Sequence, residues 1–249
     1  MRVAVLNDVH ANLPALEAVL AEVERERPDA IVFGGDLVFG PLPRETLDAM
    51  LSLGDRARFV LGNADRWFLD VYDARIEPEP EDAWLVEELD ASRRDFFAAL
   101  PKRLAMDVDG LGSILFCHGS PRSEDEIITA ITTEERLRPM LDDVEQSVVV
   151  CGHTHVQFDR VVAGTRVVNA GSVGMPYQDT PGARWAILGP DVELRRTSYD
   201  REAAADRLRA SRWARLDEFV EKYLLAPPSA AEATEHFERV ASAAEASAR

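Results

Sequence analysis

The sequence predicts an α/β protein of two packed sheets with helices outside. Two patterns support this prediction. In the first part of the chain, short apolar runs alternate with helical segments, which is the order of parallel strands joined by right-handed crossovers. From Arg103 onward the chain is rich in strands, several of which turn back at glycine-containing pairs in the manner of hairpins. A sheet that begins parallel and continues in hairpins indicates two sheets.

The alternating part begins at residue 2. Apolar runs at 2–6, 30–33 and 58–61 predict buried strands. Apolar residues at helical spacing predict helices over 13–26 and 45–53. Asn12 is the expected cap of the first helix, and Pro14 lies in its first turn.

The remaining elements follow in order. Residues 65–100 are expected to form an acidic helical insert, which is interrupted at Pro78 and Pro80. Another strand is expected at 147–151. Three hairpins are expected from strands at 104–108 and 113–117, at 156–162 and 166–168, and at 183–188 and 192–197.

Residues 199–249 are expected to form a C-terminal extension of helices beside a main domain of residues 1–198. An amphipathic pattern predicts one helix over 199–225, which Pro227 and Pro228 end. Ser229 and Glu232 form a capping box that predicts a last helix. That helix is rich in alanine, so it either frays or docks on a partner, and the extension is the candidate contact of a homodimer.

Charge and composition restrict the function classes. The formal net charge is −17, and a field of that sign repels nucleic acid and anionic membrane surfaces. No apolar run reaches the roughly 18 residues that a membrane span needs. We identify no signal peptide, and Cys117 and Cys151 are too few for a disulfide framework, so a cytoplasmic location is expected.

Polar residues with metal-binding chemistry follow the predicted strands. Four of the 5 histidines lie in these turns, beside two aspartates and one asparagine. Oxygen and imidazole ligands together suit manganese, iron, zinc, cobalt or nickel. Seven such residues are too many for one ion, so the sequence predicts two. The residues are Asp8, His10, Asp36, Asn63, His118, His153 and His155.

Two of these turns hold paired ligands one residue apart. Side chains alternate along an extended segment, so Asp8 and His10 are expected to point to the same side. The same reasoning applies to His153 and His155. Each pair is therefore expected to face one metal cluster.

In this order, the motifs resemble those of the calcineurin-like metallophosphoesterase superfamily. The stretches His118 to Arg122 and Asn169 to Gly174 also resemble its small prokaryotic phosphodiesterase branch. The resemblance covers roughly the first 190 residues. It implies a four-layer α/β/β/α sandwich of two mixed sheets flanked by helices.

The resemblance also implies roles. Asp8, His10 and His155 would hold one divalent ion, Asn63, His118 and His153 would hold the other, and Asp36 would bridge them. Manganese is favoured over iron, zinc, nickel or cobalt. A hydroxide shared by the ions would attack the phosphorus of a small phosphate ester. Asp36, Asn63 and His118 would be the catalytic residues, and Asn63 would also contact the substrate.

One departure from the family bears on the chemistry. Ala64 stands where many members have a histidine that protonates the leaving group. Losing a positioned general acid typically costs about 10²–10⁴-fold in rate, so good leaving groups are favoured. Asp65 would orient that histidine in the family, and here it is expected to cap the following helix. Ala11, where the family often has glycine, is a small change.

Several further residues have two possible roles each. Arg122 would contact the substrate phosphate or be an ordinary surface arginine. Tyr177 and Trp67 would stack on a base or pack in the core, and Ser172 would border the metals or form a simple turn. Cys117 and Cys151 are expected as small buried hydrophobes, and His236 as a surface residue.

The leading function is hydrolysis of a small phosphodiester. The alternative on the same site is hydrolysis of a phosphomonoester. A scaffold or regulatory binding protein is the alternative from another class, although scaffolds of this fold usually lose several ligands. A nuclease would need a basic groove, and no Lys/Arg cluster of that kind is evident.

Overall fold

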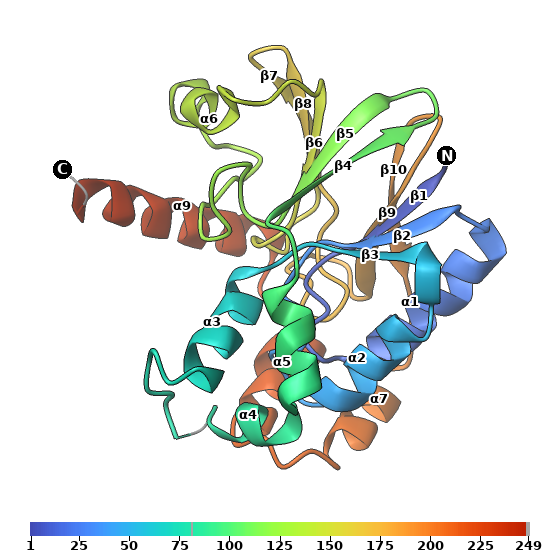
Figure 1. Cartoon of the computed structure of the whole chain (residues 1–249), viewed down its shortest axis with the longest axis vertical. Helices are drawn as coiled ribbons and strands as arrows, with labels where there is room; N and C mark the ends of the chain where they lie inside the picture. The colour runs from blue at the N-terminus through green and yellow to red at the C-terminus, as the bar shows by residue number, and fades with distance from the viewer. Residues whose placement is uncertain (81, 248–249) are drawn as a thin grey trace.

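Two five-stranded sheets lie at the centre of the protein (Figure 1), in a computed structural model that describes residues 1–80 and 82–247. The first sheet has the order β10-β9-β1-β2-β3. Its parallel strands are β1 (Val3–Leu6), β2 (Ala30–Phe33) and β3 (Ala57–Phe59). The hairpin of β9 (Ala183–Leu188) and β10 (Val192–Thr197) joins β1 in antiparallel register.

The second sheet has the order β4-β5-β6-β8-β7. The central strands β5 (Gly112–Cys117), β6 (Val148–Cys151) and β8 (Thr165–Asn169) are parallel. The edge strands β4 (Arg103–Val108) and β7 (Phe158–Val162) pair antiparallel with their hairpin partners. Both sheets are therefore mixed, as expected.

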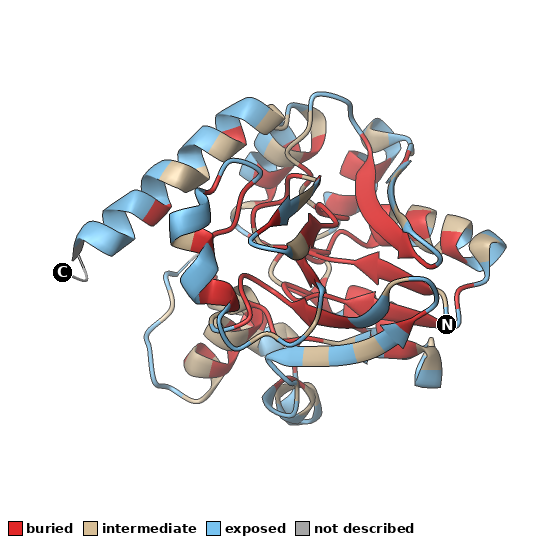
Figure 2. Cartoon of the chain, turned by 90° about the horizontal axis from the view of Figure 1, so that it is seen from above, coloured by how far each residue is buried: buried red, intermediate tan, exposed pale blue. Residues whose placement is uncertain are grey.

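The alternation of side chains along β1 shows how the sheets pack. Val3 and Val5 lie in a buried cluster with Ile114 and Phe116 of the second sheet. Ala4 and Leu6, which alternate with them along the strand, belong to the opposite cluster beneath the helices. Figure 2 shows these buried strands stacked in the middle of the molecule. The two sheets therefore pack face to face.

Helices form the two outer layers. The first sheet is covered by α1 (Leu13–Glu26), α2 (Pro43–Leu51) and the insert, with the short η1 (Gly54–Arg56) before β3. As predicted, Asn12 caps α1, because its Oδ1 accepts the N–H of Ala15 at 3.2 Å. The second sheet is covered by α6 (Glu134–Leu141), which buries Leu137. The predicted four-layer sandwich is confirmed, although α6 was not expected because Pro139 interrupts a short polar segment.

The insert contains three helices, namely α3 (Asn63–Tyr72), α4 (Trp84–Glu88) and α5 (Ala91–Ala98). Phe68 and Phe97 are fully buried and pack with ring centroids 5.2 Å apart. These helices share the cluster on the outer face of the first sheet. The predicted helical insert is confirmed in its position and helical content.

The single helix predicted over 199–225 is wrong. The chain instead forms α7 (Arg201–Leu208), α8 (Leu216–Glu218) and the π-helix η2 (Phe219–Leu225), followed by α9 (Ala230–Ser247). A straight helix of that length would extend about 40 Å. The break lets Leu208 and Trp213 enter one buried cluster with η2. Burial of this apolar surface outweighs continuous helical hydrogen bonding.

The last helix begins as predicted. Ser229 Oγ accepts the backbone N–H of Glu232 at 3.2 Å, and the Glu232 carboxylate accepts the N–H of Ser229 at 2.9 Å. This reciprocal pair is the expected capping box. Among the helices of the described residues, none combines the length and apolar character needed to cross a membrane.

Candidate metal centre

The predicted ligands lie in turns at the carboxyl ends of strands from both sheets. Asp8 follows β1 and Asp36 follows β2, while His118 follows β5 and His153 follows β6. Asn63 is the first residue of α3. Because the parallel strands of both sheets end at the same side of the sandwich, these side chains converge in one place.

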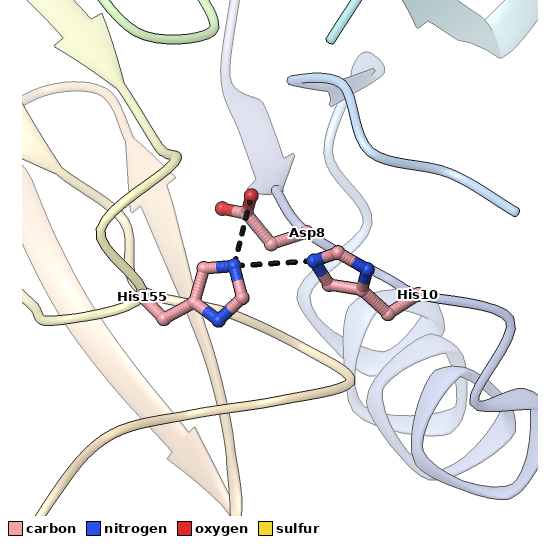
Figure 3. A group of neighbouring side chains, drawn as sticks. All are labelled: Asp8, His10 and His155. Atoms are coloured by element: carbon pink, nitrogen blue, oxygen red, sulfur yellow. Dashed lines mark hydrogen bonds and ion pairs between the residues drawn. The ribbon is translucent and has the colours of Figure 1, made fainter. Parts of the chain in front are cut away.

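One group of possible ligands contains Asp8, His10 and His155, drawn in Figure 3. One ligand atom from each lies within 4.8 Å of the others. His155 Nε2 is 3.1 Å from His10 Nε2 and 3.4 Å from Asp8 Oδ1. All three side chains are buried, so these nitrogen and oxygen atoms face one another in a space shielded from solvent.

A second group contains Asp36, His118 and His153, again with ligand atoms within 4.8 Å. Asn63 Oδ1 lies 2.9 Å from His118 Nε2 and adds a fourth donor. The Asp36 carboxylate faces both groups. Its Oδ1 is 3.4 Å from His118 Nε2, and its Oδ2 is 3.8 Å from His10 Nε2.

The outer nitrogens of three rings are held by backbone carbonyls. Nδ1 of His10 is 3.0 Å from Phe39 O, Nδ1 of His118 is 2.8 Å from Gly34 O, and Nδ1 of His155 is 2.8 Å from Met175 O. A carbonyl only accepts, so each Nδ1 must carry the hydrogen. When such a ring is neutral, it directs its Nε2 lone pair inward, as metal-ligating histidines do.

These tautomers leave acceptors facing acceptors. The Nε2 lone pairs of His10 and His155 meet at 3.1 Å, and His118 Nε2 meets the Asn63 amide oxygen at 2.9 Å. Only a proton or a cation between the partners makes such contacts favourable. The imidazole and carboxylate donors fit divalent transition metals.

Burial sets the protonation of two rings. Burial, together with the nearby His155, lowers the pKa of His10. Burial, together with the nearby His118, lowers the pKa of His153 to about 4. Both rings are therefore neutral at pH 7, with lone pairs available to a cation.

His118 behaves differently from these two rings. Burial opposes its charged form, but the adjacent Asp36 carboxylate outweighs burial and raises the pKa of His118 to about 10. In return, His118 lowers the pKa of Asp36 despite the burial of that carboxyl group. A cation must therefore compete with a proton at His118.

The expectation that the paired ligands lie on extended segments is wrong. Left-handed φ angles occur at Asp8 (52°), His10 (48°), Asp36 (53°), His153 (66°) and His155 (58°). Non-glycine residues adopt this region at a cost, and such strain collects at functional sites. Hydrogen bonds between the turns hold the conformation, for example from Asp8 N to Gly35 O at 3.1 Å and from His10 N to Asp36 O at 3.0 Å.

Two glycines allow the backbone to approach the carboxylates closely. A Cβ atom at Gly62 would lie 2.2 Å from Asp36 Oδ1, and one at Gly152 would lie 2.6 Å from Asp8 Oδ2. No side chain fits at these distances. The absence of a side chain at Gly62 and Gly152 thus leaves room for the ligands.

Asp65 ties two of the turns together. Its carboxylate accepts the backbone N–H groups of Asp36, Leu37 and Gly62, each at 2.9 Å. The bond from Gly62 caps α3, which confirms the predicted capping role. Burial and the neighbouring Asp36 raise the pKa of Asp65 to about 7, while the N–H donors of Leu37 and Gly62 oppose that rise. At Ala64, the backbone N–H donates to Asp36 Oδ1 at 2.8 Å.

The remaining candidates lie apart from the ligands or support them. Arg122 pairs with Glu126 at 2.6 Å and lines other cavities than the one over the ligands. Ser172 Oγ donates to the Asp8 carbonyl at 2.7 Å and so braces that turn. Cys117 and Cys151 are buried free thiols, and His236 is exposed, as expected.

A cavity of about 310 Å³ opens over the ligands. Tyr177 lines it, whereas Trp67 packs edge-on against Phe39 at 5.3 Å. The sequence analysis missed the residues that the C-terminal extension contributes, because no local motif marks them. They are Trp213, Arg215, Glu218, Phe219, Tyr223 and Phe237.

Comparisons with known proteins identify the family and the fold. Residues 1–190 match the family described as the calcineurin-like phosphoesterase superfamily domain. A hypothetical protein from Pyrococcus horikoshii OT3 has the same fold, with a TM-score of 0.75 and 22% identity over 92% of this chain and 99% of that one. A metallophosphoesterase from Sphaerobacter thermophilus is 28% identical, with a TM-score of 0.66, over 84% of this chain and 93% of that one.

A third relative is the symmetrical bis(5′-nucleosyl)-tetraphosphatase of Klebsiella pneumoniae. It is 33% identical over 134 residues, which are 52% of this chain and 47% of the relative. The match therefore spans about half the length of that enzyme.

Proposed function

This chain belongs to the calcineurin-like phosphoesterase superfamily and is a phosphoric ester hydrolase, and we propose that it hydrolyses a small phosphodiester with two divalent metal ions. The observation that carries the proposal is the Asp36 carboxylate, whose two oxygens face two separate groups of histidines. Asp8, His10 and His155 would hold one ion. Asn63, His118 and His153 would hold the other, with Asp36 shared.

Bound ions would polarise the phosphoryl oxygens and activate water at neutral pH. The residues of the chain supply the setting for this chemistry. Asn63 lies at the N-terminus of α3, where the positive end of the helix dipole favours an anionic phosphate. We assign Asp36, Asn63 and His118 as the catalytic residues, because Asp36 and Asn63 line the cavity and His118 Nε2 lies 2.9 Å from Asn63 Oδ1 and 3.4 Å from Asp36 Oδ1. A phosphate contact by Arg122 stays a prediction.

Ala64 restricts the leaving group of the substrate, in a diester and in a monoester alike. Without a general acid at that position, the leaving group must depart with little help, so substrates with good leaving groups react best. The Klebsiella pneumoniae relative is named for cleaving bis(5′-nucleosyl) tetraphosphates, which supports a small substrate of the kind cleaved in the phosphodiesterase branch. Hydrolysis of a phosphomonoester is the alternative on the same site. The scaffold alternative is disfavoured because all seven ligand positions keep metal-binding residues.

The proposal also covers the metal ion, the location in the cell and the oligomeric state. Manganese is the ion that we favour, and the mixed histidine and carboxylate ligands of both groups also suit iron, zinc, cobalt or nickel. Two buried free cysteines suit a reducing cytoplasm. The exposed face of α9 is the candidate contact of a homodimer, which sedimentation equilibrium tests.

Turnover of two nitrophenyl esters tests the proposed activity. Protein purified without added metal is assayed on bis-p-nitrophenyl phosphate and p-nitrophenyl phosphate, with and without Mn²⁺. We expect Mn²⁺-dependent turnover that favours the diester and is lost in Asp36→Asn. Asp55→Asn, at an exposed position, serves as the control and keeps full turnover. Preference for the monoester would favour the alternative, and no turnover of either ester would count against a hydrolase of simple esters.

A further inference from the structure

The C-terminal extension forms one wall of the cavity over the candidate ligands and is anchored on both sides of it. On one side, Phe219 and Val220 of η2 lie in a buried cluster that also contacts Phe39 and Met175 of the main domain. On the other side, α9 runs out from the body below α6 (Figure 1) and is held by Glu238. These anchors position residues of the extension over the ligands.

Glu238 accepts three hydrogen bonds from the second half of the main domain. The donors are Thr129 Oγ1 at 2.5 Å, Thr132 Oγ1 at 2.6 Å and Arg136 Nη1 at 2.7 Å. Phe237 is its neighbour in the chain, so the anchor fixes the position of that ring. Its centroid lies 6.1 Å from the ring of His153, one of the candidate ligands.

Three rings form an aromatic wall, which we define as Tyr177, Tyr223 and Phe237. Tyr177 lies 4.8 Å from the ring of His155, at an interplanar angle of 31°. Tyr223 is 6.1 Å and Phe237 is 6.4 Å from Tyr177, measured between ring centroids. The wall therefore begins in contact with the ligands and leads away from them.

The aromatic wall separates two cavities and lines both. One is the cavity of about 310 Å³ over the ligands, and the other has a volume of about 630 Å³. The second cavity is also bordered by Lys222, Pro227 and His236. Lys222 is paired with Glu218 at 2.9 Å. The other residues that line the second cavity are aromatic, proline or alanine, except for Glu232 and His236, which add polar groups.

Building on the proposed function, we propose that the aromatic wall binds a planar aromatic base carried by the substrate ester, so that the substrate class is a mononucleotide-sized phosphodiester. A base stacks on aromatic side chains through its π-face, and Glu232 and His236 of the second cavity are available to its edges. The two cavities are of the size that small ligands occupy. The formal net charge of −17 disfavours a long polyanion on the same surface.

Isothermal titration calorimetry tests this subsite without relying on turnover. Adenosine 5′-monophosphate and ribose 5-phosphate carry the same phosphate, and only the first carries a base. On the full chain loaded with Mn²⁺, we expect the nucleotide to bind at least about tenfold more tightly, as stacking on aromatic side chains predicts. Tyr223→Leu should reduce the ratio to below about threefold while leaving the affinity for ribose 5-phosphate unchanged.

Two further variants control the measurement. Phe237→Leu should lower the ratio in the same way and replaces Tyr223→Leu if that protein does not fold. Tyr72→Leu is the matched control, because its ring packs on Phe68 at 5.7 Å and lines neither cavity. Equal affinity of the two compounds in the unmodified protein would overturn the subsite, as would a ratio unchanged in both wall variants. Ester turnover without a nucleotide preference would leave the proposed function standing, and a nucleotide preference without turnover would leave the subsite standing.

Discussion

The carboxylate of Asp65 accepts the backbone N–H of Asp36 at 2.9 Å, so one buried acid holds the turn that carries another. The same carboxylate accepts the N–H groups of Leu37 and Gly62. The turns after β2 and β3 are thereby fixed to each other. Asp65 therefore helps to set the relative position of Asp36 and Asn63, which belong to these two turns, together with the hydrogen bond from Ala64 N–H to Asp36 Oδ1.

Asp65→Asn should destabilise the protein and loosen the metal centre. An amide has a single acceptor oxygen, so buried N–H donors would be left unsatisfied, at a cost of about 2–4 kcal/mol in the free energy of unfolding. Urea denaturation measures the loss, with Asp55→Asn as the exposed control expected to change by less than about 0.5 kcal/mol. Equal stability of the two variants would show that Asp65 does not hold the turns.

Turnover should depend steeply on the leaving group because of Ala64. In a series of aryl methyl phosphodiesters, we expect kcat/KM to fall at least about 100-fold from p-nitrophenol to phenol as the leaving group. Ala64→His would restore a proton donor at the start of α3 and should reduce this ratio. If kcat/KM of the unmodified protein does not change across the leaving groups, another residue protonates the leaving group.

Metal binding should release a proton from His118. Burial lowers the pKa of His118, but the adjacent Asp36 carboxylate outweighs burial and raises it to about 10, so the ring holds a proton at neutral pH. A cation that displaces this proton binds more tightly as the pH rises, by about tenfold per pH unit. Mn²⁺ titrations between pH 6.5 and 8.5 measure the slope, which His118→Gln should abolish. An affinity independent of pH over this range would contradict the prediction.

Docking of α9 should weaken in acid. Burial opposes ionisation of Glu238, but hydrogen bonds from Thr129 and Thr132 together with the charge of Arg136 lower its pKa below the ordinary value of 4.5. A lowered pKa contributes stability that is present above pH 4.5 and is lost as the pH falls further. Amide hydrogen exchange of α9, compared at pH 6 and pH 3.5 after correction for the intrinsic rate, should show lost protection.

The matched variants locate the cause of that acid effect. Glu238→Gln should remove the exchange protection of α9 already at pH 6. Glu235→Gln should not, because the Glu235 side chain on the same helix is 72% exposed. If both variants keep the protection of the unmodified helix, Glu238 is not the anchor.

The main domain was predictable because its signals are local. Strands such as β2 are short apolar runs, and Asn12 carries cap chemistry that depends only on neighbouring residues. The same is true of Ser229 and Glu232, which begin α9 in the extension. The candidate ligands were found because each follows a strand at a sheet end where parallel strands converge. Local sequence did not predict the left-handed backbone at Asp8 and His10, which hydrogen bonds from another turn maintain.

The cavity wall was not predictable for the same physical reason. Tyr223 and Phe237 reach the candidate ligands only because the helix expected over 199–225 breaks and Glu238 anchors α9. Both features depend on contacts with residues more than 100 positions away in sequence, such as Thr129 and Asp82. The hydrophobic periodicity of the sequence does not predict these contacts, because it depends only on residues that are close together in the chain.

The most direct test of the dinuclear site is a joint measurement of bound Mn²⁺ and turnover. Metal-free protein is titrated with Mn²⁺, and bound ions per chain and bis-p-nitrophenyl phosphate hydrolysis are measured in the same samples. We predict that full turnover requires two ions per chain. The Asp36→Asn variant should neither bind two ions per chain nor reach full turnover. Full turnover in the metal-free protein, or with one ion bound per chain, would contradict the dinuclear site.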